Sequence, residues 1–322
     1  FAGLIARDAL ARRRRNPPGN RRARWYGGPM ARFGTVITAM VTPFTDAGEV
    51  DHEGAAELAR WLVEQGNEAL VVTGTTGEAA CLTDPEQIAV WHTVRAAVDV
   101  PLIAGSGTND TRHAAELTSH AAEAGMDGVL IVTPYYNRPS QAGIEAHFRH
   151  VCAATELPVI VYDIPVRTGR KIGTDLILRM ADEIPNVVGL KDAAGDPGAT
   201  ARVIAEAPAG FEVFSGDDAL TLPLLAVGAV GVIGVATHWC APVMVEMVRA
   251  VERGDLARAR DLNARMLESF EFETGDLNPN PVPTKAMLRA IGRPAGPCRP
   301  PMGFGPADLE QRALDVHRRL YS

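Results

Sequence analysis

Lysine is rare in this chain, and one of its three lysines stands where a reactive amine would be expected. The 322 residues contain only Lys171, Lys191 and Lys285, while arginine supplies the rest of the cationic charge. Lys191 ends the apolar run NVVGLK, whereas Lys171 lies in a polar loop and Lys285 starts an amphipathic segment. An ordinary lysine has a pKa of about 10.4, but burial lowers that value, by several units where it is complete. We therefore expect Lys191 to be a partly buried amine that attacks a ketone and forms a Schiff base, whose protonated form makes the neighbouring carbon acidic.

Other side chains suited to this chemistry follow apolar runs elsewhere in the sequence. Schiff-base formation releases water, so it needs a proton donor and acceptor, and Tyr162 is placed to act as both. The hydroxyls of Thr75, Thr76 and Tyr136 are candidates for a proton relay to Tyr162. Arg167 carries a planar guanidinium that matches the two oxygens of a substrate carboxylate.

Eight short apolar runs alternate with helix-like segments between residues 35 and 235. The runs are typical of strands covered on both faces; they are TVITAMV, ALVVT, PLIAG, GVLIVT, PVIVY, NVVGLK, FEVFS and VGVIGV. In the segment 51–66, apolar residues recur on one helical face, with Asp51 as the N-cap and Gly66 as the stop. This order predicts an α/β fold, a (β/α)8 TIM barrel over residues 30–253. An open, doubly wound sheet is the alternative.

The strand-like runs stop before residue 254. Residues 254–322 contain three segments with helical periodicity, which predict a small C-terminal three-helix extension of the barrel.

A barrel would bring the candidate residues together, because active sites of this fold lie at the carboxyl ends of the strands. The sequences GTTGE (74–78), TPYYNRP (133–139) and SGDD (215–218) follow predicted strands, and Tyr162 and Lys191 end two others. Each feature alone is compatible with a structural role: GTTGE could be a turn before a helix, and a lysine at a strand end is usually solvated. Their convergence from different strands favours one active site.

The distribution of charge limits the classes of partner. Residues 1–29 hold eight arginines and one aspartate, so the remaining residues carry a net charge of −14 out of the total of −7. We expect residues 1–29 to be a disordered basic leader or translated upstream sequence. The acidic body argues against a nucleic-acid partner, because phosphate affinity depends on Lys and Arg contacts.

Two further patterns bear on location. The longest apolar stretch, residues 222–236, is too short to span a membrane and is broken by Pro223. The four cysteines are widely spaced and form no C-x-x-C pair, which is typical of a reduced cytoplasmic protein.

Metal and dinucleotide sites are not indicated. His147 and His150 are three residues apart on a predicted helix without a nearby carboxylate or cysteine, so we expect a surface pair and not a metal site. The sequence GSGTND (105–110) lacks the third glycine of a dinucleotide fingerprint.

The motifs also occur in an order that resembles a known family. Over about residues 33–320, GTTGE, TPYYNRPSQ, YDIPxRT, GLKDA and SGDDAL follow one another as in the dihydrodipicolinate synthases. That family belongs to the pyruvate-dependent Schiff-base aldolase and lyase superfamily. The resemblance implies condensation of pyruvate with L-aspartate 4-semialdehyde to 4-hydroxy-tetrahydrodipicolinate, in lysine and diaminopimelate biosynthesis, with no metal or organic cofactor.

Two alternatives remain open beside this activity. One is an aldolase or dehydratase that acts on a 2-keto sugar acid through the same imine. The other is a ligand-binding relative that has lost catalysis. The double threonine, the double tyrosine and Arg167 together favour the synthase.

The resemblance also assigns roles to individual residues. It implies that Lys191 forms the imine, that Tyr162 transfers protons, and that Thr75 and Tyr136 belong to the relay. Tyr136 would be reached from a neighbouring subunit, which implies a homotetramer built as a dimer of dimers. The positions matched to substrate binding are Thr76 and Ile233 for pyruvate and Arg167 for the semialdehyde.

The chain departs from the family pattern at two places. Asp163 stands where many members have asparagine, a conservative change. The lysine-inhibited bacterial members carry two histidines and a glutamate in a regulatory pocket. The aligned positions here are Asp84, Gln87 and His113, while Asn109 is retained. We therefore expect feedback inhibition by lysine to be weak or absent.

Overall fold

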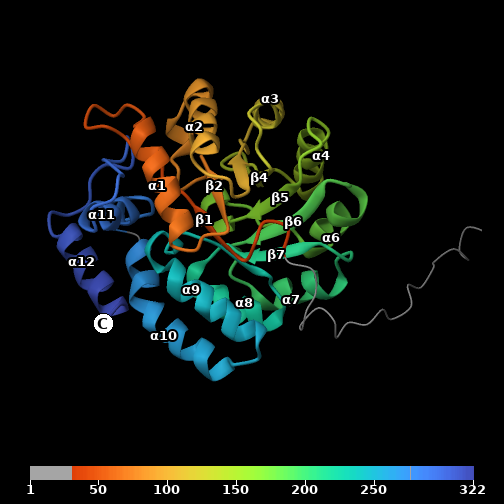
Figure 1. The fold of residues 1–322 in the computed structure, drawn as a ribbon. Coiled ribbons are helices and arrows are strands. Elements are labelled where there is room, and N and C mark those ends of the chain that lie inside the picture. The colour runs from red at the N-terminus through yellow and green to blue at the C-terminus, as the bar shows by residue number, and fades with distance from the viewer. Residues whose placement is uncertain (1–30, 276) are drawn as a thin grey trace, which may run out of the picture. The chain divides into compact units, whose positions relative to one another are not determined.

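The computed structural model describes residues 31–275 and 277–322, which contain a closed barrel of eight parallel strands (Figure 1). Each strand pairs with the next, and the barrel closes where Ile37 of the first strand pairs with Ile233 of the last. The predicted TIM barrel is confirmed, and the open sheet is wrong because such a sheet would leave its two edge strands unpaired. The strands are β1 (Val36–Ala39), β2 (Ala69–Val72), β3 (Leu102–Gly105), β4 (Gly128–Val132), β5 (Val159–Asp163), β6 (Val187–Asp192), β7 (Glu212–Ser215) and β8 (Gly231–Gly234).

Helices connect the strands and surround the barrel (Figure 1). They are α1 (His52–Glu64), α2 (Asp84–Ala97), α3 (Thr111–Glu123), α4 (Gln141–Cys152), α5 (Pro165–Thr168), α6 (Thr174–Glu183), α7 (Pro197–Glu206), α8 (Thr221–Val227) and α9 (Thr237–Glu252). Two short 3₁₀ helices, η2 (Ala79–Cys81) and η3 (Asp218–Leu220), follow β2 and β7.

Strand alternation decides which side chains face the barrel interior. Leu190 and Val161 belong to the buried cluster that also contains the helix side chains. Their neighbours Lys191 and Tyr162 therefore face inward, and Tyr162 lies in the inner apolar cluster with Ile233.

The helix ends follow the local sequence. The Asp51 side chain accepts a hydrogen bond from the backbone N–H of Gly54, as expected of an N-cap. Gly66, just after α1, adopts a left-handed φ of +100°, which favours glycine. Thr83 and Glu86 form a capping box at the start of α2.

The three helices expected in the C-terminal extension are present. They are α10 (Leu256–Glu273), α11 (Val282–Ala290) and α12 (Leu309–Leu320). Their apolar side chains form a buried cluster with those of α9, so they pack beside the barrel and extend its core (Figure 1). The division at residues 253 and 254 stays a prediction, and the prediction for residues 1–29 lies outside the described residues.

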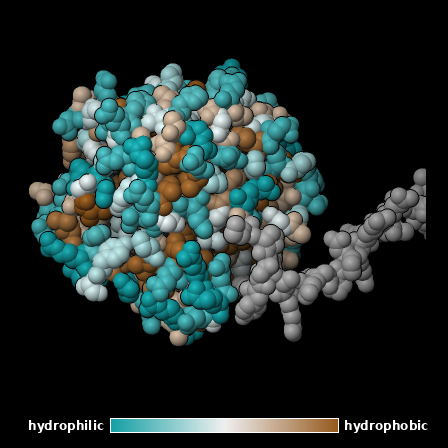
Figure 2. All heavy atoms as spheres, viewed as in Figure 1, coloured by the Kyte–Doolittle hydropathy of each residue, from teal (hydrophilic) through white to brown (hydrophobic). Residues whose placement is uncertain are grey.

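The surface of the described residues is largely polar. Hydrophilic side chains cover most of the face seen in Figure 2, with apolar residues in small patches between them. Among the described residues, no helix combines the length and the apolar character that crossing a membrane requires.

One expectation about surface residues is wrong. His147 is only 3% exposed, because it lies on the buried face of α4 with Ile144 and Val151. Its Nδ1 is 3.0 Å from the Thr111 hydroxyl, and burial lowers the pKa of His147 to about 4. His150, one turn further along the helix, is exposed as expected.

Candidate active site

Lys191 and Tyr162 lie side by side at the carboxyl ends of neighbouring strands. The two residues are register partners in the β5–β6 ladder. The Lys191 Nζ is 4.3 Å from the centroid of the Tyr162 ring, and the residues are 4% and 6% exposed. The structure therefore brings together the two residues that the sequence assigned to Schiff-base chemistry.

Burial makes the Lys191 amine more reactive than an ordinary lysine. Burial lowers the pKa of Lys191 to about 8, although the negative charge of Asp218 opposes this shift. At pH 7 about one amine in ten is then neutral, against about one in three thousand for a solvated lysine. Only the neutral amine attacks a carbonyl carbon, so this environment favours imine formation.

Tyr162 is held in the opposite state. Burial raises its pKa, the positive charge of Arg167 opposes this, and the charges of Asp217 and Asp163 add to the rise. The phenol is therefore protonated near neutral pH and can donate a proton. Asp163 itself is buried, accepts a hydrogen bond from the Ile172 N–H at 3.2 Å, and has its pKa raised to about 7 by burial.

Asn280, a residue that the sequence analysis missed, connects two predicted substrate contacts. Its side-chain Nδ2 donates to the Thr76 hydroxyl at 2.9 Å, and its backbone carbonyl accepts from Arg167 at 3.4 Å. The Thr284 hydroxyl donates to Asn280 Oδ1 at 3.0 Å, which fixes the orientation of the amide. Since Thr76 accepts from Asn280, its own O–H remains available to a substrate carboxylate.

A buried ion pair fixes the turn that carries Thr75 and Thr76. Lys285 Nζ lies 2.6 Å from Glu78 Oε1, and the two side chains are 0% and 1% exposed. Lys285 also donates to the Pro297 carbonyl at 2.9 Å. Glu78 has a left-handed φ of +57°, which is uncommon for a residue with a side chain. Lys285 is thus fully buried with a carboxylate as its partner.

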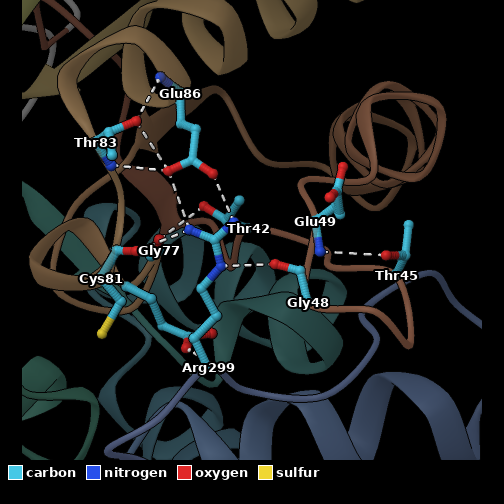
Figure 3. Close-up of polar contacts among 10 residues, drawn as sticks. Thr42, Thr45, Gly48, Glu49, Gly77, Cys81, Thr83, Glu86 and Arg299 are labelled. Atoms are coloured by element: carbon cyan, nitrogen blue, oxygen red, sulfur yellow. Dashed lines mark hydrogen bonds and ion pairs between the residues drawn. The ribbon is translucent and has the colours of Figure 1, made fainter.

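Arg299 connects the Glu78–Lys285 ion pair to the start of α2 (Figure 3). Its guanidinium pairs with Glu86 at 2.6 Å and donates to the carbonyls of Cys81 and Gly48, each at 2.8 Å. Its backbone N–H donates to Glu78 at 2.9 Å. The hydrogen bonds from Arg299 lower the pKa of Glu86 to about 2. Residues beyond the barrel therefore fix the GTTGE turn in place.

The structure does not assemble the whole predicted relay within one chain. Thr75 is exposed and Tyr136 is 90% exposed, while Tyr162 is buried. Tyr136 adopts a left-handed φ of +69°, a strained conformation that is often found at functional positions. Ile233 is fully buried in the inner cluster on β8. The roles of these residues stay predictions.

Two of the positions matched to the regulatory pocket, Asp84 and His113, contact each other. The His113 Nε2 lies 2.9 Å from both carboxylate oxygens of Asp84, and both side chains are partly exposed. Asn109 donates to the Tyr135 carbonyl at 3.3 Å. Asp84 therefore already has a partner.

Metal-binding geometry is not seen in the described part of the chain, where no three His, Cys, Asp or Glu residues gather as ligands. Two surface hollows of about 330 and 380 Å³ lie between α10 and α12 and beside α6. Neither is lined by a candidate site residue.

A buried lysine on β6 beside a protonated tyrosine on β5 is typical of (β/α)8-barrel aldolases and lyases that act through a lysine Schiff base. The sequence model of the Dihydrodipicolinate synthetase family matches residues 32–318. The chain belongs to this family.

Individual relatives agree with this placement. The chain is 47% identical over 274 residues to the 4-hydroxy-tetrahydrodipicolinate synthase of Moorella thermoacetica, covering 84% of this chain and 92% of that protein. It is 43% identical over 274 residues to the enzyme of the same name from Bacillus subtilis, covering 84% and 93%.

Solved structures agree as well. Dihydrodipicolinate synthase from Cyanidioschyzon merolae with lysine bound has a TM-score of 0.87 and 41% identity, covering 90% of this chain and 98% of that one. A structure described as the first monomeric dihydrodipicolinate synthase variant has a TM-score of 0.85 and 33% identity, covering 89% and 96%.

Proposed function

We propose that this chain condenses pyruvate with L-aspartate 4-semialdehyde, through a Schiff base on Lys191, to give 4-hydroxy-tetrahydrodipicolinate. The observation that carries the proposal is the contact between Lys191 and Tyr162, with Nζ 4.3 Å from the ring centroid at the barrel mouth. Membership of the family and the names of the relatives support it.

The first step joins pyruvate to the enzyme. The neutral Lys191 amine attacks C2 of pyruvate, and the resulting carbinolamine loses water as Tyr162 donates a proton to the leaving hydroxyl. The product is a cationic imine. Loss of a proton from the methyl group then gives an enamine, with Tyr162 and the hydroxyl relay as the path for that proton.

The second step forms the new carbon–carbon bond. The enamine carbon attacks the aldehyde carbon of the semialdehyde, and the aldehyde oxygen takes up a proton to become the 4-hydroxyl. The amino group of the semialdehyde then attacks the imine carbon, which closes the ring and releases the Lys191 amine. One water is lost overall, at imine formation.

Substrate carboxylates are assigned to the flanking residues. Thr76 donates its free O–H to the carboxylate of pyruvate, and Arg167 pairs with the carboxylate of the semialdehyde. Thr75 and Tyr136 complete the relay to Tyr162, and Ile233 contacts pyruvate. These assignments rest on the resemblance and on the positions of the residues around the barrel mouth.

The proposed working unit is a cytoplasmic homotetramer, a dimer of dimers. Tyr136 supports this assembly, because a tyrosine that is 90% exposed and held at φ +69° is free to reach a neighbouring subunit. Sedimentation velocity of the purified protein tests it, and a monomer at assay concentration would contradict it.

Reductive trapping tests the chemistry. Borohydride with pyruvate should attach one adduct to the peptide that contains Lys191, and the purified protein should consume L-aspartate 4-semialdehyde in a coupled assay. Lys191→Arg should abolish trapping, because a guanidinium remains protonated. An adduct on Lys171 or Lys285 would overturn the mechanism, and trapping without consumption of the semialdehyde would overturn the proposed substrate.

A further inference from the structure

Two buried carboxyl groups lie in contact with each other beside the Schiff-base site. Asp218 starts η3 after β7, and Glu273 ends α10 of the extension. They are 1% and 7% exposed, α10 packs against η3, and the two carboxyl groups lie within hydrogen-bonding reach of each other. Asp218 Oδ1 and Glu273 Oε2 meet no N–H or O–H donor within the described residues. Two buried carboxyl groups this close cannot both be ionised, so the pair holds at least one proton.

The surroundings favour one proton and one negative charge. The backbone N–H of Val235 donates to Asp218 Oδ2 at 2.7 Å, and the backbone of Ala236 opposes the rise in the pKa of Glu273. Both residues immediately precede α9, whose N-cap Ala236 offers no capping side chain. The positive end of a helix dipole stabilises a negative charge at this position, while the proximity of two carboxylates prevents both from ionising.

Of the two carboxyl groups, Asp218 is the one that accepts a backbone N–H at hydrogen-bond distance, from Val235 at 2.7 Å, and such a bond favours the charged form. Burial and the neighbouring Asp218 raise the pKa of Glu273 well above its ordinary value. Burial also raises the pKa of Asp218, but its hydrogen bonds from Val235 and Glu273 oppose that rise. We therefore expect the negative charge on Asp218 and the proton on Glu273.

The loop that carries Asp218 packs directly on Lys191. A methyl group placed on Gly216 would lie 2.9 Å from Lys191 Cγ, and one on Gly234 would lie 2.4 Å from Asp218 Oδ1. Glycine is required at both positions for this close approach.

Charged and titratable groups surround the pair from several parts of the fold. Around the pair lie Lys191 on β6, Asp217 just before η3 and Cys240 on α9. Arg167 on α5 acts on Lys191. The positive charge of Arg167 lowers the pKa of Lys191, while Asp218 and Glu273 raise it. The net field at Lys191 therefore depends on the charge of the Asp218–Glu273 pair.

We propose that Asp218 and Glu273 share one proton and act as a positioning pair that supplies a single negative counter-charge to the nitrogen of Lys191. This inference rests on the proposed Schiff base at Lys191. The imine nitrogen alternates between a neutral amine and a cation during the reaction. Two negative charges would hold the amine as unreactive ammonium, and none would leave the cationic imine unsupported in a buried site. A single negative charge leaves part of the amine neutral and still stabilises the cationic imine.

Substitutions of equal size separate the two roles. Glu273→Gln keeps a neutral donor toward Asp218, so the pH at which trapping by pyruvate and borohydride is half-maximal should stay near that of the wild type. Asp218→Asn removes the negative charge, so that midpoint should fall by about one unit or more, the usual size for a nearby opposite charge. A structural role alone would change yield or melting temperature without moving the midpoint.

Each outcome decides a part of the inference. If Glu273→Gln lowers the midpoint as Asp218→Asn does, Glu273 is ionised and the shared proton is refuted. If Asp218→Asn leaves the midpoint unchanged, the counter-charge is refuted. Absence of any adduct on Lys191 in the wild type would refute the proposed function instead.

A measurement independent of activity covers the case in which Asp218→Asn fails to fold. The infrared spectrum of the wild-type protein near pH 9, where Asp163 with its pKa of about 7 is ionised, should contain the C=O band of a protonated carboxylic acid. That band should shift in H₂O–D₂O difference spectra and should disappear in Glu273→Gln. Its persistence in Glu273→Gln would refute the assignment of the proton to Glu273.

Discussion

The buried pair of Lys285 and Glu78 offers a sharp test of how the C-terminal extension supports the barrel mouth. Lys285 has three partners: Glu78 at 2.6 Å, the Pro297 carbonyl at 2.9 Å and the face of Phe44, 4.1 Å from the ring centroid. Lys285→Met keeps most of the volume but leaves the Glu78 carboxylate buried, with the Arg299 backbone N–H as its remaining donor.

The expected loss of unfolding free energy comes from leaving the buried Glu78 carboxylate without its cationic partner. Removing one partner of a buried ion pair costs about 3–5 kcal/mol of unfolding free energy, whereas replacing both partners with neutral groups of similar volume is often close to neutral. We therefore expect Lys285→Met to lose about 3–5 kcal/mol. Addition of Glu78→Gln should recover most of that loss, which corresponds to a coupling energy of at least about 2 kcal/mol.

Urea unfolding of the two single variants and the double variant measures this coupling. Protein concentration must be the same throughout, because assembly shifts apparent stability. Arg318→Met is the matched control, since Arg318 pairs with Asp315 at an exposed position and should cost less than about 1 kcal/mol. A loss below about 1 kcal/mol for Lys285→Met, or a double variant no more stable than it, would refute the reasoning.

The remaining predictions concern Lys191 and the regulatory positions. Trapping by pyruvate and borohydride should be half-maximal near pH 8 in the wild type, since burial lowers the pKa of Lys191 to about 8; a midpoint above pH 10 would mean a solvated amine. Lys191→Met should stabilise the protein by about 3 kcal/mol at pH 7, from a shift of about 2.5 units. Because the pKa of Lys191 is lower in the folded protein than the unfolded value of 10.5, its charged form destabilises the fold, and this cost is complete below pH 8. Calorimetry should therefore show the stability gained by Lys191→Met shrinking as the pH rises from 8 toward 10.5. L-lysine should inhibit the condensation weakly or not at all, because His113 replaces an attractive carboxylate and already pairs with Asp84. Loss of one charge-assisted hydrogen bond costs about 1.5–3 kcal/mol, roughly ten- to a hundredfold in affinity; strong inhibition by submillimolar lysine at saturating pyruvate would contradict this.

Local patterns predicted the fold because each strand and helix is encoded by consecutive residues. The eight apolar runs correspond one to one with β1–β8, and the Asp51 cap and the three C-terminal helices lie where expected. Lys191 and Tyr162 could be chosen for the same reason, since strand alternation and residue type identify an inward lysine and tyrosine.

Long-range contacts could not be predicted in this way. Asn280 meets Thr76 across 204 residues and Arg167 across 113, and nothing in the sequence near Asn280 indicates those partners. His147 was misplaced because its polarity outweighed its spacing from Ile144 and Val151, which puts it on the apolar face of α4.

The extension contributes contacts to the candidate active site. It supplies a cation, Lys285, to the turn that carries Thr76, and an amide, Asn280, to the Thr76 hydroxyl. It also supplies the carboxyl group of Glu273 to the neighbourhood of Lys191. A barrel closed by its own eight strands satisfies its backbone hydrogen bonds without these residues, so its geometry alone does not require them. These residues serve the chemistry instead, because the buried Lys191 amine, the turn that carries Thr76 and the Thr76 hydroxyl each need a partner that the strands do not offer.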